Sequence, residues 1–179
     1  MNATTTLALM TAALITTGPA APATPGPAAP PLSQLTSRVY PIVFQVEDLE
    51  GTRRETRSAS EVRYTLQASL LFAKDSSTLS PAARSALDDV ARKIAAARPS
   101  QPVKIIGYTD DLGSAAHGLK LSRDRANAVK DLLHKRSELA DVSFTTEGLG
   151  EARPIADNGS EAGRKKNRRV EIVVPTPTT

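Results

Sequence analysis

The chain has 179 residues, of which 40% are hydrophobic, and its 23 basic and 19 acidic side chains leave a net charge of +4. This length predicts one folded domain with additional segments. The absence of cysteine excludes disulfides, thiolate metal sites, a cysteine nucleophile and an acylated lipoprotein anchor. The only two histidines, His117 and His134, do not have the spacing of metal ligands, so we expect no metal and no other cofactor.

Residues 1–31 combine a signal-like apolar segment with a linker that is rich in alanine and proline. The apolar stretch Leu7–Ile15 is shorter than the about 20 residues that span a bilayer, and its length is typical of a signal peptide. No lysine or arginine precedes it, although signal peptides normally begin with positive charge. Pro19–Pro31 cannot bury a core and predicts an extended spacer. We therefore expect an exported protein without a transmembrane segment, located in the cell wall, the periplasm or the extracellular space.

Residues 32–65 are expected to form a strand and hairpin that precede the main domain. Val39–Val46 is β-branched and aromatic, and Pro41 within it favours a position at the edge of a sheet. Glu61–Phe72 first alternates between polar and apolar residues and then becomes apolar, which indicates a strand. The main domain is predicted at residues 66–175, and a frayed tail at residues 176–179.

The main domain begins its first helix at Ser80 and Pro81, because serine is a good N-cap and proline fits the first helical position. This helix is predicted to run to Ala97, and Pro99 ends it. The other predicted elements are a strand at Gln101–Tyr108, a helix at Lys120–Lys135, a strand at Val142–Thr146, a helical turn at Ser160–Asn167 and a strand at Arg169–Val174. This βαβαββ order predicts an α+β fold, an α/β sandwich in which two helices pack on one face of a mixed sheet, with the N-terminal hairpin added.

A pair of carboxylates, Asp110 and Asp111, lies where a predicted strand ends and a loop leads into a helix. Open α/β sheets place ligand-binding groups at such strand ends. On the helix, Arg125 lies four residues after Leu121 and four before Val129, so it shares their apolar face. A half-buried arginine requires a partner or a route to water. Arg125 is therefore either structural, paired with one of the two aspartates or reaching solvent, or it faces a cavity that binds a ligand with an ammonium and a carboxylate.

Short motifs follow one another through the second half of the chain. They are Phe72, Ser76 and Leu79, then Gly107–Asp110, Gly113, Leu121–Ser122, Arg125–Ala126, Gly148–Glu151, Pro154 and Asn167–Glu171. In type and spacing they resemble the signature of the OmpA-like C-terminal domain family. The resemblance extends from about Leu66 to Val174. It implies a bacterial cell-envelope protein that binds peptidoglycan non-covalently and is not an enzyme.

The resemblance also implies the binding residues. In the family, the motif aspartate and arginine hold the diaminopimelate of the peptidoglycan stem peptide, and these roles fall to Asp110 and Arg125. Thr109 belongs to the same motif. Amides of the loop from Asp111 to Gly113 are expected to donate further hydrogen bonds, because glycine lets the backbone approach a ligand.

The chain departs from the family at one position of this site. The family usually has asparagine where this chain has Gly118, so the amide that would complete the site is missing. His117 either replaces this amide or is an exposed residue at the start of the helix. Near the last strand, Arg168 or Arg169 either faces the binding cleft or is a solvated terminal arginine.

Two other functions are weaker interpretations of the sequence. The basic run Arg164–Arg169 favours nucleic-acid or anionic-polymer binding, but aromatic residues for base stacking are nearly absent, so we expect no nucleic-acid partner. A wall hydrolase would need Asp110 and Asp111 as an acid/base pair, yet adjacent residues of a loop usually point apart. The sequence leaves open whether the domain forms a dimer.

Overall fold

The computed structural model describes residues 44–48 and 51–176 of the chain. The predicted signal-like segment, the linker, Pro41 and most of the tail therefore lie outside the described residues. Within the described part, no helix combines the length and the apolar character that a membrane crossing requires.

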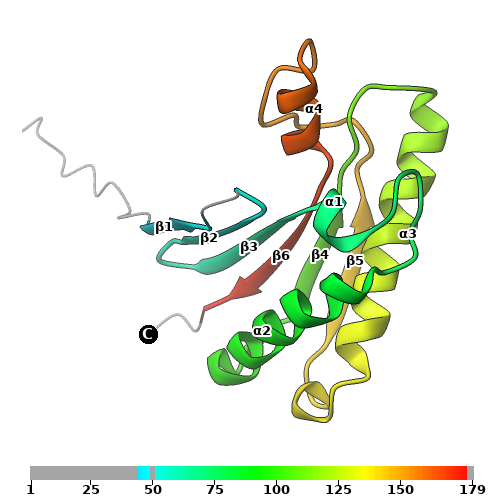
Figure 1. The fold of residues 1–179 in the computed structure, drawn as a ribbon. Coiled ribbons are helices and arrows are strands. Elements are labelled where there is room, and N and C mark those ends of the chain that lie inside the picture. Colours follow the sequence, from blue (N-terminus) through cyan, green and yellow to red (C-terminus); the bar gives the residue numbers. More distant parts are fainter. Residues whose placement is uncertain (1–43, 49–50, 177–179) are drawn as a thin grey trace, which may run out of the picture. The chain divides into compact units, whose positions relative to one another are not determined.

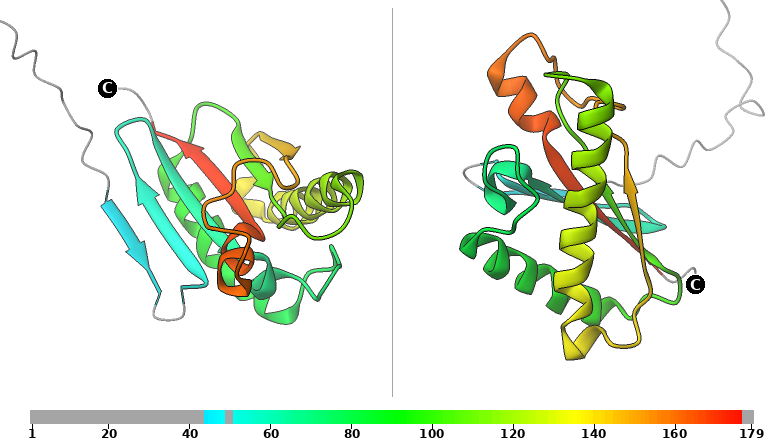
Figure 2. Two further views of the ribbon diagram at one scale, coloured as in Figure 1. Left: turned by 90° about the horizontal axis from the view of Figure 1, so that it is seen from above. Right: turned by 90° about the vertical axis from the view of Figure 1, so that its right-hand side faces the viewer.

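The centre of the fold is one mixed sheet with the strand order β1-β2-β3-β6-β4-β5, in which only β4 and β5 pair in parallel. The strands are β1 (Phe44–Glu47), β2 (Arg53–Arg57), β3 (Glu61–Gln67), β4 (Val103–Gly107), β5 (Phe144–Gly148) and β6 (Arg169–Pro175). Two long helices, α2 (Pro81–Ala97) and α3 (Ala115–His134), cover the same face of the sheet (Figures 1 and 2). The predicted α+β fold, with its mixed sheet, two helices on one face and added hairpin of β1 and β2, is confirmed.

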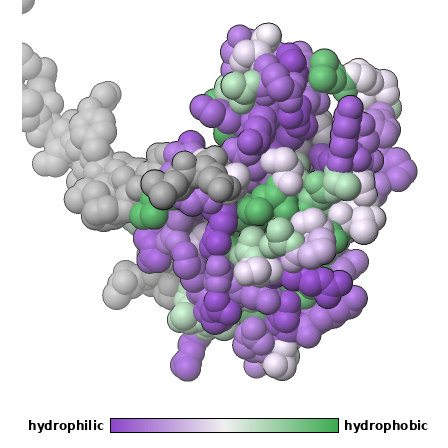
Figure 3. All heavy atoms as spheres, viewed as in Figure 1, coloured by the Kyte–Doolittle hydropathy of each residue, from purple (hydrophilic) through white to green (hydrophobic). Residues whose placement is uncertain are grey.

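Three short helical segments complete the described part of the fold. They are α1 (Ala68–Leu71), the 3-10 helix η2 (Ser137–Leu139) and α4 (Glu161–Asn167). Hydrophilic side chains cover most of the visible surface, and hydrophobic residues gather in a band between α4 and α2 (Figure 3).

The termini of α2 agree with the sequence-based prediction. The Ser80 hydroxyl accepts a hydrogen bond from the Ala83 amide at 3.0 Å, and Pro81 occupies the first helical position. The helix ends at Arg98, whose left-handed φ of 46° turns the chain away before Pro99. Its buried face contributes to a mostly aliphatic core together with β3, β4, β6 and α3.

Several predicted boundaries are wrong. The strand predicted at Glu61–Phe72 stops at Gln67, because the next residues form α1 and turn Ala68 and Leu71 into the core. The polar segment Arg53–Arg57 forms β2, a strand within residues 32–65, where the sequence predicts a strand and hairpin. Helix α3 begins at residue 115 rather than at residue 120. Ser114 is its N-cap, because the Ser114 hydroxyl accepts a hydrogen bond from the amide of residue 117 at 3.3 Å.

Helix α3 lies directly on the backbone of β4 and β5. A Cβ atom at Gly107 would stand 2.0 Å from the Ser122 carbonyl oxygen, and one at Gly148 would stand 2.5 Å from the Arg123 amide nitrogen. The fully buried Ser122 hydroxyl donates to the Leu119 carbonyl at 2.8 Å and accepts from the Gly150 amide at 3.0 Å. These contacts fix α3 against the strand ends.

We predict that Gly107→Ala lowers the free energy of unfolding by about 3 kcal/mol, because two backbones must separate to admit the methyl group. Urea denaturation measures this change. Gly159→Ala is the matched control, since a Cβ there meets only atoms of the Asp157 side chain, which can move. Equal stability of the two variants would show that α3 does not depend on this close approach.

Candidate functional site

The candidate site lies at the end of the sheet where β3, β4 and β5 finish and β6 begins (Figure 1). Beyond β4, the Tyr108 amide donates to the Arg169 carbonyl at 2.9 Å, and the Thr109 amide donates to the Gly150 carbonyl at 2.8 Å. These hydrogen bonds fix the backbone up to the residue before Asp110. The Asp110 carboxylate therefore has a defined position at the start of the loop that leads to α3.

The Asp110 carboxylate is mostly buried, with 10% of its side chain exposed. Its Oδ2 atom accepts a hydrogen bond from Nη1 of Arg168 at 2.5 Å. Its Oδ1 atom lies 3.4 Å from the Leu112 amide, in the geometry of an Asx turn. The ion pair at Asp110 is thus made by Arg168, and neither Asp110 nor Asp111 pairs directly with Arg125 among the described residues.

Arg125 lies on the buried face of α3 and is only 4% exposed, as its spacing on the helix predicted. Its Nε atom donates to the Ser76 carbonyl at 2.9 Å, and its guanidinium carbon lies 5.2 Å from the centroid of the Phe72 ring. The described residues supply no carboxylate within ion-pair distance and no hydrogen-bond acceptor for its two terminal nitrogens. The arginine is held in place while the outer part of its planar fork has no protein partner in this part of the chain.

The electrostatics of Arg125 reflect this arrangement. Burial lowers the pKa of its guanidinium, because a charged group loses hydration there. The carboxylate of Asp75 opposes this effect most strongly, Asp110 opposes it less, and the positive charge of Arg168 adds to it. Asp110 and Arg168 are therefore close enough to Arg125 for their charges to act on its pKa.

Arg168 bridges two acidic residues. Besides Asp110, it contacts Glu161, whose Oε1 atom lies 2.5 Å from Nη2. Burial alone would lower the pKa of Arg168, but the hydrogen bonds with Glu161 and Asp110 outweigh it and raise the pKa. Arg169, the alternative candidate, is instead buried beyond the site, where it stacks 3.7 Å from the Tyr108 ring centroid and pairs with Glu171 at 2.7 Å.

The remaining predicted residues lie around this cluster. Asp111, Gly113 and His117 are exposed, and Gly113 adopts a φ of 91° that favours glycine. Thr109 is 7% exposed, and its hydroxyl has no hydrogen-bond partner among the residues that the structure describes. A Cβ atom at Gly118 would lie 2.9 Å from this hydroxyl, so the glycine and the threonine occupy complementary space.

Sequence reasoning did not assign a site role to the segment that follows α1. This segment supplies the Ser76 carbonyl, the Phe72 ring and the Asp75 carboxylate, all of which act on Arg125. The spacing of Phe72 and Ser76 was the available signal. Their contacts with α3 depend on how the loop folds back over that helix.

The basic run at the C-terminus does not form a continuous basic surface. Arg164 donates to the Asn158 carbonyl at 2.7 Å and pairs with Glu161 at 3.0 Å, and the next two arginines are paired as described above. Only Lys165 and Lys166 of this run are exposed without an ion pair in the part of the chain that the structure covers. No group of residues in that part has the arrangement of a metal site.

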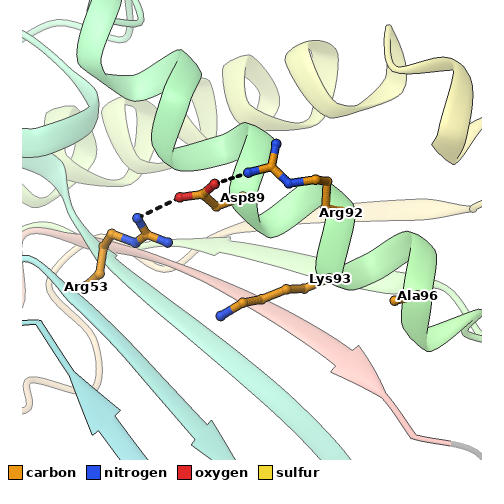
Figure 4. Close-up of a pocket in the computed structure, with 5 residues that line it drawn as sticks. All are labelled: Arg53, Asp89, Arg92, Lys93 and Ala96. Atoms are coloured by element: carbon orange, nitrogen blue, oxygen red, sulfur yellow. Dashed lines mark hydrogen bonds and ion pairs between the residues drawn. The ribbon is translucent and has the colours of Figure 1, made fainter.

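A separate surface hollow of about 290 Å³ lies between β2 and α2 (Figure 4). Its lining residues are Arg53, Asp89, Arg92, Lys93 and Ala96. Each of its cations has an acidic partner: Arg53 and Arg92 both contact Asp89, and Lys93 lies 2.5 Å from Glu55. The hollow therefore offers no unpaired charge, which is why the cluster around Asp110 and Arg125 is the better candidate.

Comparison of the sequence with known families gives one match over the main domain. The sequence profile of the OmpA family matches residues 71–168. Among curated proteins, the chain is 45% identical over 105 residues to the peptidoglycan-binding protein ArfA of Mycobacterium tuberculosis, covering 59% of this chain and 32% of ArfA. It is 34% identical over 122 residues to the putative lipoprotein YfiB of Escherichia coli, covering 68% of this chain and 76% of YfiB. The chain thus spans only about a third of the length of ArfA.

Solved structures show the same fold. The cell wall anchor of the T6SS from Pseudomonas aeruginosa superposes with a TM-score of 0.60 at 27% identity, over 70% of this chain and 89% of the anchor. The periplasmic domain of Helicobacter pylori MotB gives a TM-score of 0.61 at 22% identity, over 74% of this chain and 87% of that domain. The second likeness supports the fold alone.

We predict that Thr109→Val leaves the free energy of unfolding unchanged or raises it by up to about 1 kcal/mol, because the replaced hydroxyl has no partner to lose. Chemical denaturation tests this expectation. Thr146→Val is the matched control, since the Thr146 hydroxyl donates to Oδ1 of Asn127 at 2.8 Å and its loss should cost about 1 kcal/mol. Equal losses in both variants would mean that the Thr109 hydroxyl has a partner in the folded protein.

Proposed function

The chain belongs to the OmpA family, and on this premise we propose that its main domain binds peptidoglycan non-covalently. Two relatives support the proposal through what their names state: ArfA is a peptidoglycan-binding protein, and the structure from the T6SS is a cell wall anchor. The same relationship supports an exported protein of the cell envelope, placed in the periplasm, the cell wall or outside the cell.

The observation that carries the proposal is the state of Arg125. Its guanidinium is buried, fixed by Ser76 and Phe72, and has no carboxylate partner among the described residues, although a buried charge without a counter-ion is costly. A ligand carboxylate would supply the missing charge, and the planar fork suits it because two parallel hydrogen bonds can form.

The ligand group we propose is the diaminopimelate of the stem peptide. Its free end carries an ammonium and a carboxylate on one carbon atom. Asp110 would accept hydrogen bonds from the ammonium, and Arg125 would hold the carboxylate. The exposed loop from Asp111 to Gly113 would add backbone amides, which the left-handed conformation of Gly113 makes accessible.

The expected affinity suits a polymer with many copies of the same group. A hydrogen bond to a charged partner contributes roughly 1.5–3 kcal/mol to the binding free energy. The free-energy cost of association offsets a large part of what two or three such bonds contribute. Modest affinity for each copy would let the domain exchange between neighbouring stem peptides and still stay on the polymer.

The alternatives receive less support from the site. A wall hydrolase would need two cooperating carboxylates, whereas Asp110 is paired with Arg168 and Asp111 is exposed. Nucleic-acid or anionic-polymer binding would need a basic surface, and most arginines of the run at 164–169 are taken by internal carboxylates.

We predict that Arg125→Ala weakens co-sedimentation with purified peptidoglycan roughly tenfold to a hundredfold, because the hydrogen bonds to the carboxylate are lost. Arg125→Lys should not restore binding, since one ammonium cannot form the bidentate contact. Arg123→Ala is the matched control, because Arg123 is an exposed arginine on the same helix. Full binding by the lysine variant would contradict the bidentate contact, and full binding by the alanine variant would contradict the site.

We also predict that the domain distinguishes two soluble stem peptides. A peptide with lysine in place of diaminopimelate keeps the ammonium but lacks the adjacent carboxylate, so its affinity in isothermal titration calorimetry should be at least about tenfold lower. The difference should largely disappear in the Arg125→Ala variant, where the carboxylate has no partner. Equal affinities of the unmodified domain for both peptides would contradict a carboxylate contact at Arg125.

A further inference from the structure

We propose that Arg168 is an internal competitor of the ligand: it occupies Asp110 in the free domain, and the ligand ammonium displaces it onto Glu161. This inference rests on the proposed function, because it concerns the ligand that Asp110 would bind. It assigns to Arg168 a role opposite to that of a ligand clamp.

In the free domain the Asp110 carboxylate is already occupied. Oδ2 accepts from Nη1 of Arg168 at 2.5 Å, and Oδ1 faces the Leu112 amide at 3.4 Å. An ammonium that approaches Asp110 therefore meets a carboxylate whose charge is already neutralised. It must share or replace the guanidinium, and replacement is the only way for it to gain the full charge of the carboxylate.

Arg168 is free to leave this ion pair, whereas Asp110 is not. The Arg168 side chain is 28% exposed and the Asp110 side chain only 10%. Asp110 follows directly on residues whose amides are bonded to β6 and to the Gly150 carbonyl. The arginine thus has a path to solvent, whereas the aspartate is fixed by the backbone around it.

A second carboxylate partner for Arg168 is already in place. Nη2 of Arg168 lies 2.5 Å from Oε1 of Glu161, at the first turn of α4. The hydrogen bonds from Arg168 and then Arg164 lower the pKa of Glu161, so this carboxylate stays ionised. When the ligand takes Asp110, Arg168 keeps one carboxylate and is not left as an unpaired charge.

The proposal separates two kinds of ligand. A peptide with a free amine must displace Arg168. It therefore loses part of the binding free energy that its ammonium gains at Asp110. A peptide whose amine is acylated carries no charge there, leaves Arg168 in place and binds through Arg125 and the loop amides. Removal of Arg168 should therefore favour the first ligand and leave the second unaffected.

The test is calorimetric titration of a diaminopimelate tripeptide, and of the same peptide with its side-chain amine acetylated, into the unmodified protein and Arg168→Gln. We expect the variant to bind the free-amine peptide roughly threefold to tenfold more tightly, as loss of a partly exposed ion pair predicts, and the acetylated peptide equally well. Weaker binding of the free-amine peptide, no change, or an equal gain for both peptides would each overturn the proposal.

A double-mutant cycle with Glu161→Gln provides a second, independent readout. Without its second carboxylate, Arg168 should hold Asp110 more firmly, so this variant should bind the free-amine peptide roughly twofold to fivefold more weakly. The same change should have no effect in the Arg168→Gln background, and an equal effect in both backgrounds would overturn the proposal. If the unmodified protein binds neither peptide, the proposed function fails instead, and the two failures are thus distinguishable.

Discussion

The contact of α3 with the glycine ends of β4 and β5 is the constraint on which the site depends. At Gly107 and Gly148 the helix backbone lies so close to the strands that no side chain fits between them. The Ser122 hydroxyl stabilises this contact, because it donates to the Leu119 carbonyl within α3 and accepts from the Gly150 amide just after β5. Because Asp110 follows β4 and Arg125 lies one turn after Ser122, the same contact fixes the two charges relative to each other.

The charged side chains of the site differ in how completely the protein provides them with ion-pair and hydrogen-bond partners. Asp110, Arg168 and Glu161 form a chain of ion pairs that reaches from the buried end of β4 to the surface of α4. Arg125 contacts the Ser76 carbonyl and the Phe72 ring, and none of the described carboxylates lies within ion-pair distance of it. Such incomplete pairing of a buried charge is costly in free energy, and a ligand that supplies the missing anion would offset the cost.

Much of the fold follows from local sequence signals. The Ser80–Pro81 start of α2, the strand at the end of the domain and the burial of Arg125 all depend on spacing or on single-residue preferences, and the structure agrees with them. The missed helical turn of α1, with the sequence ASLL, is too short and too apolar for its periodicity to distinguish a helix from a strand, and only tertiary packing decides between the two structures.

The pairing within the site could not be predicted in the same way. The sequence placed Asp110 and Arg125 near one another, but the ion pair at Asp110 comes from Arg168, 58 residues away. That pair depends on how α4 is positioned above β6, which no local pattern determines. The same reason explains why the Ser76 carbonyl, 49 residues from Arg125, was not identified as its partner.

The account depends on Asp110 and Arg125 acting together on one ligand group. The most direct measurement is a nuclear magnetic resonance titration of the isotope-labelled protein with a diaminopimelate stem peptide, following backbone amides and arginine side-chain Nε–H signals. The account predicts that the signals of Arg125, Arg168 and the amides from Asp110 to Gly113 shift together along one binding curve. Shifts confined to the hollow lined by Arg53 and Arg92, with Arg125 unchanged, would contradict it.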